Sequence, residues 1–447
     1  MNNKQFFRRL LALALPIALQ NLLASCGYLI DTAMVTALGN VAISAIGVAS
    51  RWSFLMNIVT FGVCSGSATL IAQSWGAGDH RTIRRTTGLA LCAVTGIGLL
   101  YILLAQLFPG QMMSLFTNEA EVIAAGQDYI RIAAFSVLFS GISLVVSTAV
   151  RSTEDVATPF IASTVGVISN CVLNYGLIYG NFGLPALGLE GAALATVIAM
   201  FLQVTVIFAI AARKKSVFLQ DRRQLFGWDS SFVKKYIGIS TPVLLNEVLW
   251  AVGTNIYAMI LARQGSENYA AYTVFNSIHE VFFVFFVGLC NASAIMVGKA
   301  IGEKKPDEAY RIAGRNLIAI PVLSLVLGSL QILLRYPILN VMQLETAGAQ
   351  QTAADLLVLH GLLMPLINVP YLGVVGIFRA GGDTKYGFFI DTFSVYFMGI
   401  PVLWYMAYMT NASFLTMVAG MYLSEYILKS ILCLRRYKSR KWIRDLA

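Results

Sequence analysis

The sequence predicts an all-α integral membrane protein of about twelve transmembrane helices, and three observations support this prediction. Apolar residues make up 57% of the chain and charged residues only 12%, with a mean hydropathy of +0.72. Soluble domains carry about 25% charged residues and about 45–50% apolar ones. The apolar residues also lie in long continuous stretches, and the second half of the chain repeats the first.

The apolar stretches account for the predicted helices in order. Crossing the hydrocarbon of a bilayer takes about 20 mostly apolar residues per helix. About twelve stretches meet this length: 10–38, 45–74, 86–108, 122–150, 159–180, 190–212, 237–262, 271–300, 313–334, 352–378, 387–409 and 413–434. They lack the polar–apolar alternation of barrel strands, so we expect helices throughout.

The internal repeat predicts two pseudo-symmetric six-helix bundles. A shift of 226 residues places the first half on the second, and two further residues are inserted later on. The matched pairs include Pro16 and Pro242, Gly39 and Gly265, Gly62 and Gly288, Cys64 and Cys290, Arg151 and Arg379, and Asp155 and Asp383. We therefore predict an N-terminal lobe at 1–212, a cytoplasmic connection at 213–235 and a C-terminal lobe with a basic tail at 236–447. Such a plan is typical of transporters.

The net charge of +10 comes from lysines and arginines on alternate loops. The positive-inside bias makes these loops cytoplasmic, which predicts a multi-pass protein with both termini inside the cell. This pattern explains the basic charge without a nucleic-acid partner. The first apolar run is too long for a cleavable signal peptide, so we expect it to be retained. The aromatics Phe218, Phe226 and Trp228 favour a connection that lies along the membrane surface.

Motifs for enzymatic chemistry are not visible. The sequence has no phosphate-binding loop, metalloprotease signature or serine-nucleophile elbow, and its six cysteines have neither zinc nor disulfide spacing. We therefore expect no enzyme, no cofactor and no direct use of ATP.

Polar side chains within the apolar stretches carry the functional signal, because a charge at the bilayer centre costs roughly 2.5–3.5 kcal/mol. Asp31 lies in the first stretch, and its repeat counterpart is Tyr257, so the fold itself does not require an acid there. Asn170 and Asn174 are four residues apart, hence on one helix face. Together with Thr196 they could form a sodium site at Asp31 or a hydrogen-bond network around it. Structural packing is the alternative.

The second half has its own polar residues. Glu247, His279, Glu280 and Asp391 are candidates for substrate binding or secondary ion coupling, as is Tyr257. Salt bridges or snorkelling near the cytoplasmic side are the alternative for Glu247 and Asp391, and a structural role is favoured for His279. Glu425 and Lys429 are four apart in the last stretch and are expected to pair with each other.

Several of these segments resemble the multidrug and toxic compound extrusion (MATE) transporters over essentially the whole chain. They are the first helix with Pro16, Gln20 and Ile30-Asp31-Thr32-Ala33-Met34-Val35, the run 72–78, the run 174–180 leading to Gly191 and Thr196, and the run 378–384. The resemblance implies two six-helix bundles around a V-shaped central cavity. It also implies export of cationic or amphiphilic organic compounds in exchange for protons or sodium.

The resemblance assigns the ion-coupling acid to Asp31 and its polar partners to Asn170, Asn174 and Thr196. This chain departs from one branch, where an aspartate stands at the position of Asn174. It also lacks the mid-helix glutamate of another branch, near Trp250. The resemblance therefore leaves the coupling ion open.

The implied mechanism is competition between a small cation and a drug for Asp31. Aromatic residues could line the path of a lipophilic cation, namely Tyr28, Tyr175, Tyr257, Phe282, Phe283 and Tyr371. We expect small organic molecules and membrane lipid as partners, a functional monomer and a cell (inner) membrane location. A lipid-linked oligosaccharide flippase of the same broad superfamily is the alternative, although it calls for a more cationic cavity. A channel usually needs a symmetric ring of pore-lining groups, which the acids do not form.

Overall fold

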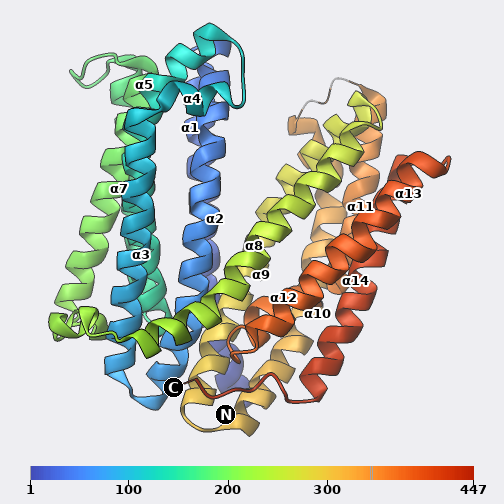
Figure 1. Cartoon of the computed structure of the whole chain (residues 1–447). Coiled ribbons are helices and arrows are strands. Elements are labelled where there is room, and N and C mark those ends of the chain that lie inside the picture. Colours follow the sequence, from blue (N-terminus) through green and yellow to red (C-terminus); the bar gives the residue numbers. More distant parts are fainter. Residues whose placement is uncertain (1, 343, 345, 447) are drawn as a thin grey trace. The chain divides into compact units, whose positions relative to one another are not determined.

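The computed structural model describes residues 2–342, 344 and 346–446, and this part of the chain is helical with no strand (Figure 1). The first half contains α1 (Asn3–Thr36), α2 (Asn40–Ala77), α3 (His80–Leu107), α4 (Pro109–Ser114), α5 (Ala120–Ser152), α6 (Ala157–Tyr179) and α7 (Gly188–Arg213), followed by the 3₁₀ turns η1 (Val217–Leu219) and η2 (Arg222–Phe226). The second half contains α8 (Ser230–Ala262), α9 (Ser266–Gly302), α10 (Pro306–Met342), α11 (Ala347–Tyr371), α12 (Thr384–Phe393), α13 (Ile400–Met409) and α14 (Phe414–Lys438).

Twelve helices in the described part are long and apolar enough to cross a membrane, which confirms the predicted number. Two of these spans contain π-helical segments that the sequence did not predict. The π-helix η3 (Leu372–Phe378) extends α11, and η4 (Ser394–Gly399) joins α12 to α13. The short helix α4 is also additional and is not a span.

Several helices extend beyond the apolar stretches that predicted them. Helix α1 begins at Asn3 rather than at residue 10, and α8 begins at Ser230 rather than at 237. Hydropathy does not detect these polar first turns, since helical hydrogen bonding continues outside an apolar stretch. Residues 230–235 of the predicted connection are therefore helical. The remaining connection is held at Phe218, which is buried in a cluster with Ile71 and Ile83.

The chain forms two compact units, whose divisions fall inside α1 and α8. The N-terminal unit is Leu19–Leu244, and the C-terminal unit is Met1–Ala18 together with Leu245–Ala447. Each division lies two residues after a repeated proline, Pro16 or Pro242. The predicted lobes at 1–212 and 236–447 follow the sequence repeat rather than these contacts, and that division stays a prediction.

A repeated glycine accommodates the first helix of each half. In the N-terminal unit, a Cβ atom on Gly62 of α2 would lie 2.8 Å from Leu244 Cα of α8. In the C-terminal unit, a Cβ atom on Gly288 of α9 would lie 2.6 Å from the Ala14 oxygen of α1. Both glycines permit a close helix approach, which small residues favour in membranes.

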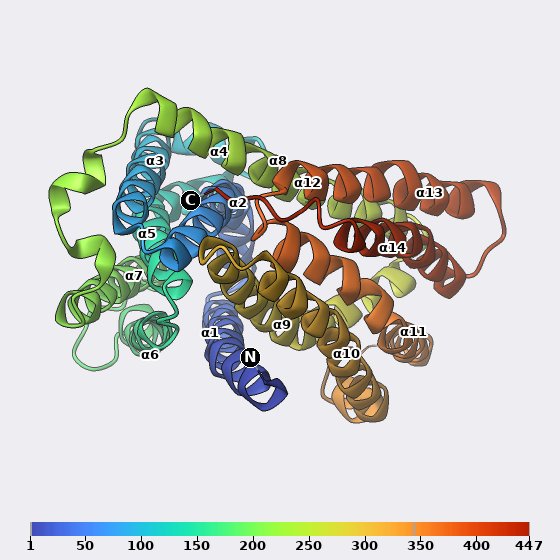
Figure 2. The same ribbon diagram turned by 90° about the horizontal axis from the view of Figure 1, so that it is seen from below.

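Each unit brings its candidate residues together through helix packing. In the N-terminal unit α5 packs against α2, α3 and α7, and α6 packs along α7. In the C-terminal unit α11 packs against α9, α10 and α14 (Figure 2). The segment η4 packs against α14.

Candidate functional site

Asp31 lies near the end of α1 and faces α6 within the N-terminal unit. One turn before it, Gly27 permits the approach of α6, because a Cβ atom there would lie 3.0 Å from a Val167 methyl carbon. Asn170 and Asn174 follow Val167 on α6, and both are buried. The close approach of the two helices therefore places a carboxylate beside two amides.

Both amides contact the Asp31 carboxylate. Asn174 Nδ2 donates to Asp31 Oδ1 at 2.6 Å. Because an amide oxygen would meet only acceptors at this place, the Asn170 amide turns its nitrogen toward Asp31 and donates to Oδ2 at 3.0 Å. The other end of the Asn170 amide lies 3.4 Å from Thr196 Oγ1. The structure thus brings together Asp31, Asn170, Asn174 and Thr196, and their coupling role stays a prediction.

Close packing of α6 on α7 positions Thr196. The Gly191 Cα on α7 approaches the Leu177 carbonyl of α6, where a Cβ atom would clash. Thr196 Oγ1 lies 3.0 Å from the Ala192 carbonyl and faces the Asn170 amide oxygen, so its hydroxyl can donate to either oxygen.

The chemistry of this site suits an ionised carboxylate that can meet a cation. Two N–H donors directed at Asp31 stabilise the charged form. Asn174 Oδ1 is buried and has no hydrogen-bond partner in the described part of the chain, so an acceptor remains beside the acid. Tyr28 and Tyr175, on the same two helices, are exposed and offer aromatic surface nearby.

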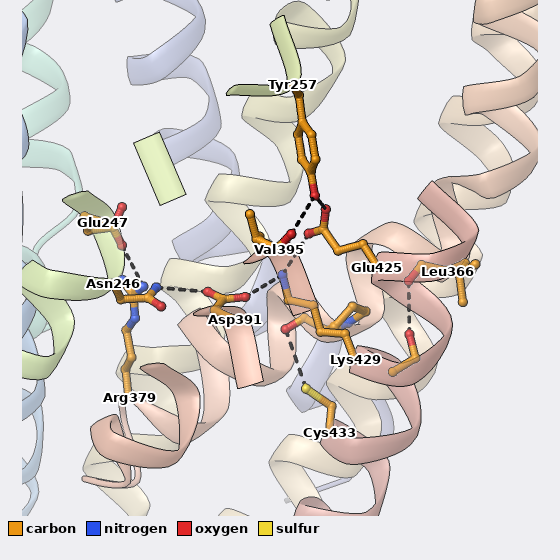
Figure 3. Close-up of polar contacts among 12 residues, drawn as sticks. Asn246, Glu247, Tyr257, Leu366, Arg379, Asp391, Val395, Glu425, Lys429 and Cys433 are labelled. Carbon is orange, nitrogen blue, oxygen red and sulfur yellow. Dashed lines mark hydrogen bonds and ion pairs between the residues drawn. The ribbon is translucent and has the colours of Figure 1, made fainter. Parts of the chain in front are cut away.

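The C-terminal unit contains a buried ionic cluster, which we call the α14 cluster: Asn246, Tyr257, Asp391, Glu425 and Lys429 (Figure 3). Lys429 Nζ forms an ion pair with Asp391 Oδ1 and lies 3.5 Å from Glu425 Oε1. Asn246 Nδ2 donates to Asp391 Oδ2 at 2.9 Å, and Tyr257 OH donates to Glu425 Oε2 at 2.9 Å. Helices α8, α12 and α14 each contribute to this cluster.

Glu247 lies beside the α14 cluster but pairs elsewhere. Its Oε1 lies 2.6 Å from a guanidinium nitrogen of Arg379, whose side chain is 6% exposed (Figure 3). Arg379 is the repeat counterpart of Arg151, which donates to Gln20 at 3.1 Å in the N-terminal unit. The ion-pairing interpretation of Glu247 therefore agrees with its geometry.

The remaining candidates lie apart from both sites. His279 packs among aromatic rings, with the His360 ring centroid 4.5 Å away and the Phe283 centroid 5.5 Å away. Glu280 is exposed. Phe282 is buried, and Phe283 and Tyr371 pair with ring centroids 4.9 Å apart.

Sequence reasoning missed part of the α14 cluster. The four-residue spacing of Glu425 and Lys429 predicted their contact, and the structure contains it. The stronger contact of Lys429 with Asp391 has no spacing signature. Asn246 was also missed, although its repeat counterpart Gln20 stands in one of the recognised segments.

Comparison with known families identifies the repeat independently. The family model MatE matches residues 16–176 and again residues 242–405, so the two matches begin at Pro16 and Pro242. A "Probable multidrug resistance protein NorM" of Thermotoga maritima is 22% identical over 97% of this chain and 93% of its own. "Probable multidrug resistance protein YoeA" of Bacillus subtilis is 26% identical over 91% and 88%.

Solved structures match the fold at low sequence identity. An outward-facing multidrug resistance MATE family transporter of the MOP superfamily superposes with a TM-score of 0.87 at 17% identity, over 97% of this chain and 96% of that one. A MOP superfamily transporter from Pyrococcus furiosus gives a TM-score of 0.86 at 16% identity, with the same coverage. These similarities confirm the predicted all-α membrane fold.

Proposed function

The chain belongs to the MatE family, and from this premise we propose that it is a secondary active multidrug exporter. It would carry cationic or amphiphilic organic compounds out of the cell in exchange for protons or sodium ions, by alternating access. The curated relatives named for multidrug resistance support the export of small organic compounds. The exchange and its coupling ion rest on the site at Asp31.

The observation that carries this proposal is an acid in a membrane span with two amide donors directed at it. Such residues are costly in a bilayer and mark ion or substrate pathways. The repeat counterpart Tyr257 shows that the helix forms without an acid at this position. Asp31 is therefore the residue that we assign to coupling.

Competition at Asp31 would couple the two fluxes. When the carboxylate is ionised, it attracts an organic cation, and exposed Tyr28 and Tyr175 can cover the apolar part of that cation. A proton bound to Asp31 removes the charge and turns away one amide donor. The organic cation then loses its counter-ion and is released.

Sodium could take the same place. Hard cations prefer oxygen ligands, and the site offers the Asp31 carboxylate, the unpartnered Asn174 Oδ1 and Thr196 Oγ1. Sodium and an ion-free, ionised Asp31 require different orientations of the amides. Sodium binds the amide oxygens, whereas the ionised Asp31 carboxylate accepts hydrogen bonds from the amide nitrogens.

The substitution Asp31→Asn tests the proposal. We expect ion-driven efflux of ethidium from inverted membrane vesicles to fall by about tenfold or more, as expected when a coupling free energy of the usual size is lost. Sodium and pH gradients are imposed separately, so the gradient that drives the wild type identifies the ion. Protein content in the membrane should stay unchanged.

Asp128→Asn is the matched control, because Asp128 is an exposed acid of the same unit, with a side chain 59% exposed. It should export like the wild type. Wild-type efflux by Asp31→Asn under either gradient would refute the assignment of coupling to Asp31.

The flippase alternative would require free cationic groups to hold a pyrophosphate. Two buried cations of the C-terminal unit instead have acidic partners, Arg379 with Glu247 and Lys429 with Asp391. We therefore place drug export first. Transport of a labelled lipid-linked sugar in proteoliposomes, without ethidium export, would reverse this order.

The remaining proposals concern the protein in its cell. We place it in the cell (inner) membrane, with both termini cytoplasmic, because of the loop charges. We also propose that it works as a monomer with no cofactor besides its coupling ion. Labelling of single cysteines added at either terminus, from each side of the membrane, tests the topology.

A further inference from the structure

The α14 cluster contains more negative than positive groups. Asp391 and Glu425 both contact Lys429, and the side chains of all three are at most 12% exposed. With both acids ionised, the cluster carries a net charge of −1, and no further ion pair offsets it among the residues that the structure describes. The neighbouring Glu247 pairs with Arg379. Unbalanced charge is strongly unfavourable in a low-dielectric interior.

Comparison of the two units shows that the charges are an addition to the shared scaffold. Gln20 Nε2 donates to Ser163 Oγ at 2.8 Å in the N-terminal unit. With the repeat shifts of 226 and 228, these residues fall on Asn246 and Asp391, which form the equivalent hydrogen bond in the C-terminal unit. A neutral serine thus serves the same contact, so packing does not require an acid at Asp391.

The repeat also relates Glu425 to the site in the other unit. The residue that corresponds to Asp31 is Tyr257, and Tyr257 donates its hydrogen bond to Glu425. Both units therefore have a carboxylate at the equivalent turn. It is Asp31 of α1 in the N-terminal unit and Glu425 of α14, bound by Tyr257, in the C-terminal unit.

We propose that the α14 cluster is a second proton-binding site, at which Glu425 takes up and releases one proton while Lys429 and Asp391 remain an ion pair. The bound proton cancels the excess negative charge. If the protein is the proposed exporter, its export then responds to two protonation sites, Asp31 and Glu425. That consequence rests on the proposed function.

The hydrogen bonds identify Glu425 as the acceptor of the proton. Each acid has one further donor, Asn246 for Asp391 and Tyr257 for Glu425. Asp391 has the shorter contact with Lys429, so it forms the stronger ion pair. Tyr257 OH has an alternative acceptor, the Val395 carbonyl at 3.5 Å. When Glu425 is protonated, the Tyr257 hydroxyl can donate to the Val395 carbonyl instead. The Tyr257 oxygen then accepts a hydrogen bond from the protonated Glu425 carboxyl group.

A narrow cleft with no room for a water molecule lies beside the cluster. It is lined by Asn246, Trp250, Asp391, Thr392, Val395 and Tyr396. Asn246 is only 4% exposed, yet its Oδ1 has no hydrogen-bond partner in the described part of the chain, and the same holds for Thr392 Oγ1. Both oxygens can therefore accept a hydrogen bond beside Asp391.

Lys429 can pass the proton between the acids. A proton that reaches Asp391 moves to Lys429 as Lys429 gives one of its own to Glu425, which leaves Asp391 ionised and Lys429 positively charged. A metal cation is disfavoured at this place because the Lys429 ammonium already lies against both carboxylates. The ligand is therefore a proton.

Other titratable groups face Glu425 from the surrounding helices and belong to the same electrostatic unit. They are Tyr257 from α8, Tyr272 from α9, Asp391 from α12, and Tyr422, Tyr426 and Lys429 from α14. His360 of α11 stands behind Tyr422, with ring centroids 6.2 Å apart. The tyrosines are neutral donors, so the exchangeable proton remains with the acids.

Infrared difference spectroscopy of the purified full-length protein tests the site. Acidification should produce the carbonyl-stretch band of a protonated carboxyl group. Glu425→Gln should remove this band. Tyr257→Phe keeps every charge but removes one hydrogen bond, so the band should persist with a shifted frequency and a shifted titration midpoint.

Asp31→Asn serves as the control in the other unit and should leave the Glu425 band unchanged. A band of equal intensity and midpoint in wild type, Glu425→Gln and Tyr257→Phe would overturn the proposal, as would the lack of any titrating band that depends on Glu425. If Glu425→Gln does not fold, an unshifted band in Tyr257→Phe alone contradicts it.

Ethidium efflux measured in parallel separates this inference from the proposed function. If the wild type shows the Glu425 band but no ion-driven efflux, the exporter proposal fails and the proton site stands. If efflux depends on Asp31 and no Glu425 band titrates, the proton site fails and the exporter proposal stands. If both hold, Glu425→Gln should change the pH dependence of efflux.

Discussion

At the scale of single residues, several close contacts require glycine, because any larger residue would place a Cβ atom in the contact. Gly399, the last residue of η4, lies against the Tyr257 hydroxyl and Glu425, and a Cβ atom there would clash with the hydroxyl. Gly253 of α8 leaves similar space for Val395, with a distance of 2.5 Å to its nearest methyl carbon. The hydrogen bond between Tyr257 and Glu425 therefore requires a glycine at position 399, and Gly253 accommodates Val395.

Gly399→Ala should destabilise the protein by about 1–3 kcal/mol, as overpacking of a filled interior does. Thermal unfolding in detergent measures the change. Gly96→Ala is the control, because a Cβ atom on Gly96 of α3 meets nothing within 4 Å. Combining Gly399→Ala with Tyr257→Phe removes the clashing hydroxyl, so the double variant should lose less stability than the two single losses together. Equal stability of the Gly399 and Gly96 variants would contradict this account.

At the scale of helices, each half has an acid before its fifth span that pairs with basic residues at or after the end of its sixth span. Asp155 accepts from Thr158 N at 3.2 Å before α6 and pairs with Lys214 at 3.0 Å. Asp383, before α12, is buried and pairs with Arg436 and Arg444, each at 2.6 Å. Acids are favourable at helix N-termini, and the pairs connect the ends of neighbouring helices.

Asp383→Asn should cost more stability than Asp155→Asn. The Asp383 side chain is 1% exposed, and loss of one partner of a buried pair costs about 3–5 kcal/mol. Asp155 and Lys214 are more exposed, so their pair is worth under about 1 kcal/mol. Asparagine retains capping ability at either position. The unfolding midpoints of the two variants measure their losses of stability. Equal losses would contradict the prediction that the buried Asp383 contributes more than the exposed Asp155.

At the scale of the molecule, the repeat organises packing as well as sequence. Each compact unit includes the first part of one long helix, and the division follows a proline in both cases. Gly62 and Gly288 are repeat counterparts, and so are the residues that they face, Leu244 and Ala18. The duplicated sequence therefore retains duplicated helix contacts.

Gly62→Ala and Gly288→Ala should each destabilise the protein by about 1–3 kcal/mol, because the added methyl group meets backbone atoms that cannot move independently. Gly47→Ala is the control, since a Cβ atom on Gly47 has open space. Unfolding in detergent, followed by size-exclusion chromatography, measures the loss. A tolerated alanine at either repeated position would contradict the assigned close packing.

Hydropathy, internal repetition and residue spacing predicted the membrane class, the twelve spans, the duplication and the helix face shared by Asn170 and Asn174. These features are local or periodic, since hydropathy and four-residue spacing can be read along one segment. The repeat also identified Asp31 as an acid that the duplicated scaffold does not need.

The choice of ion-pair and hydrogen-bond partners, in contrast, depends on how distant helices pack. Asn246 donates a hydrogen bond to Asp391, which is 145 residues away in the sequence. Lys429 lies closer to Asp391 than to Glu425, its neighbour on the same helix. The divisions inside α1 and α8 and the π-helical segment η4 likewise have no local signature. They follow from which helix faces can approach each other, and that depends on the packing of all the helices in a unit at once.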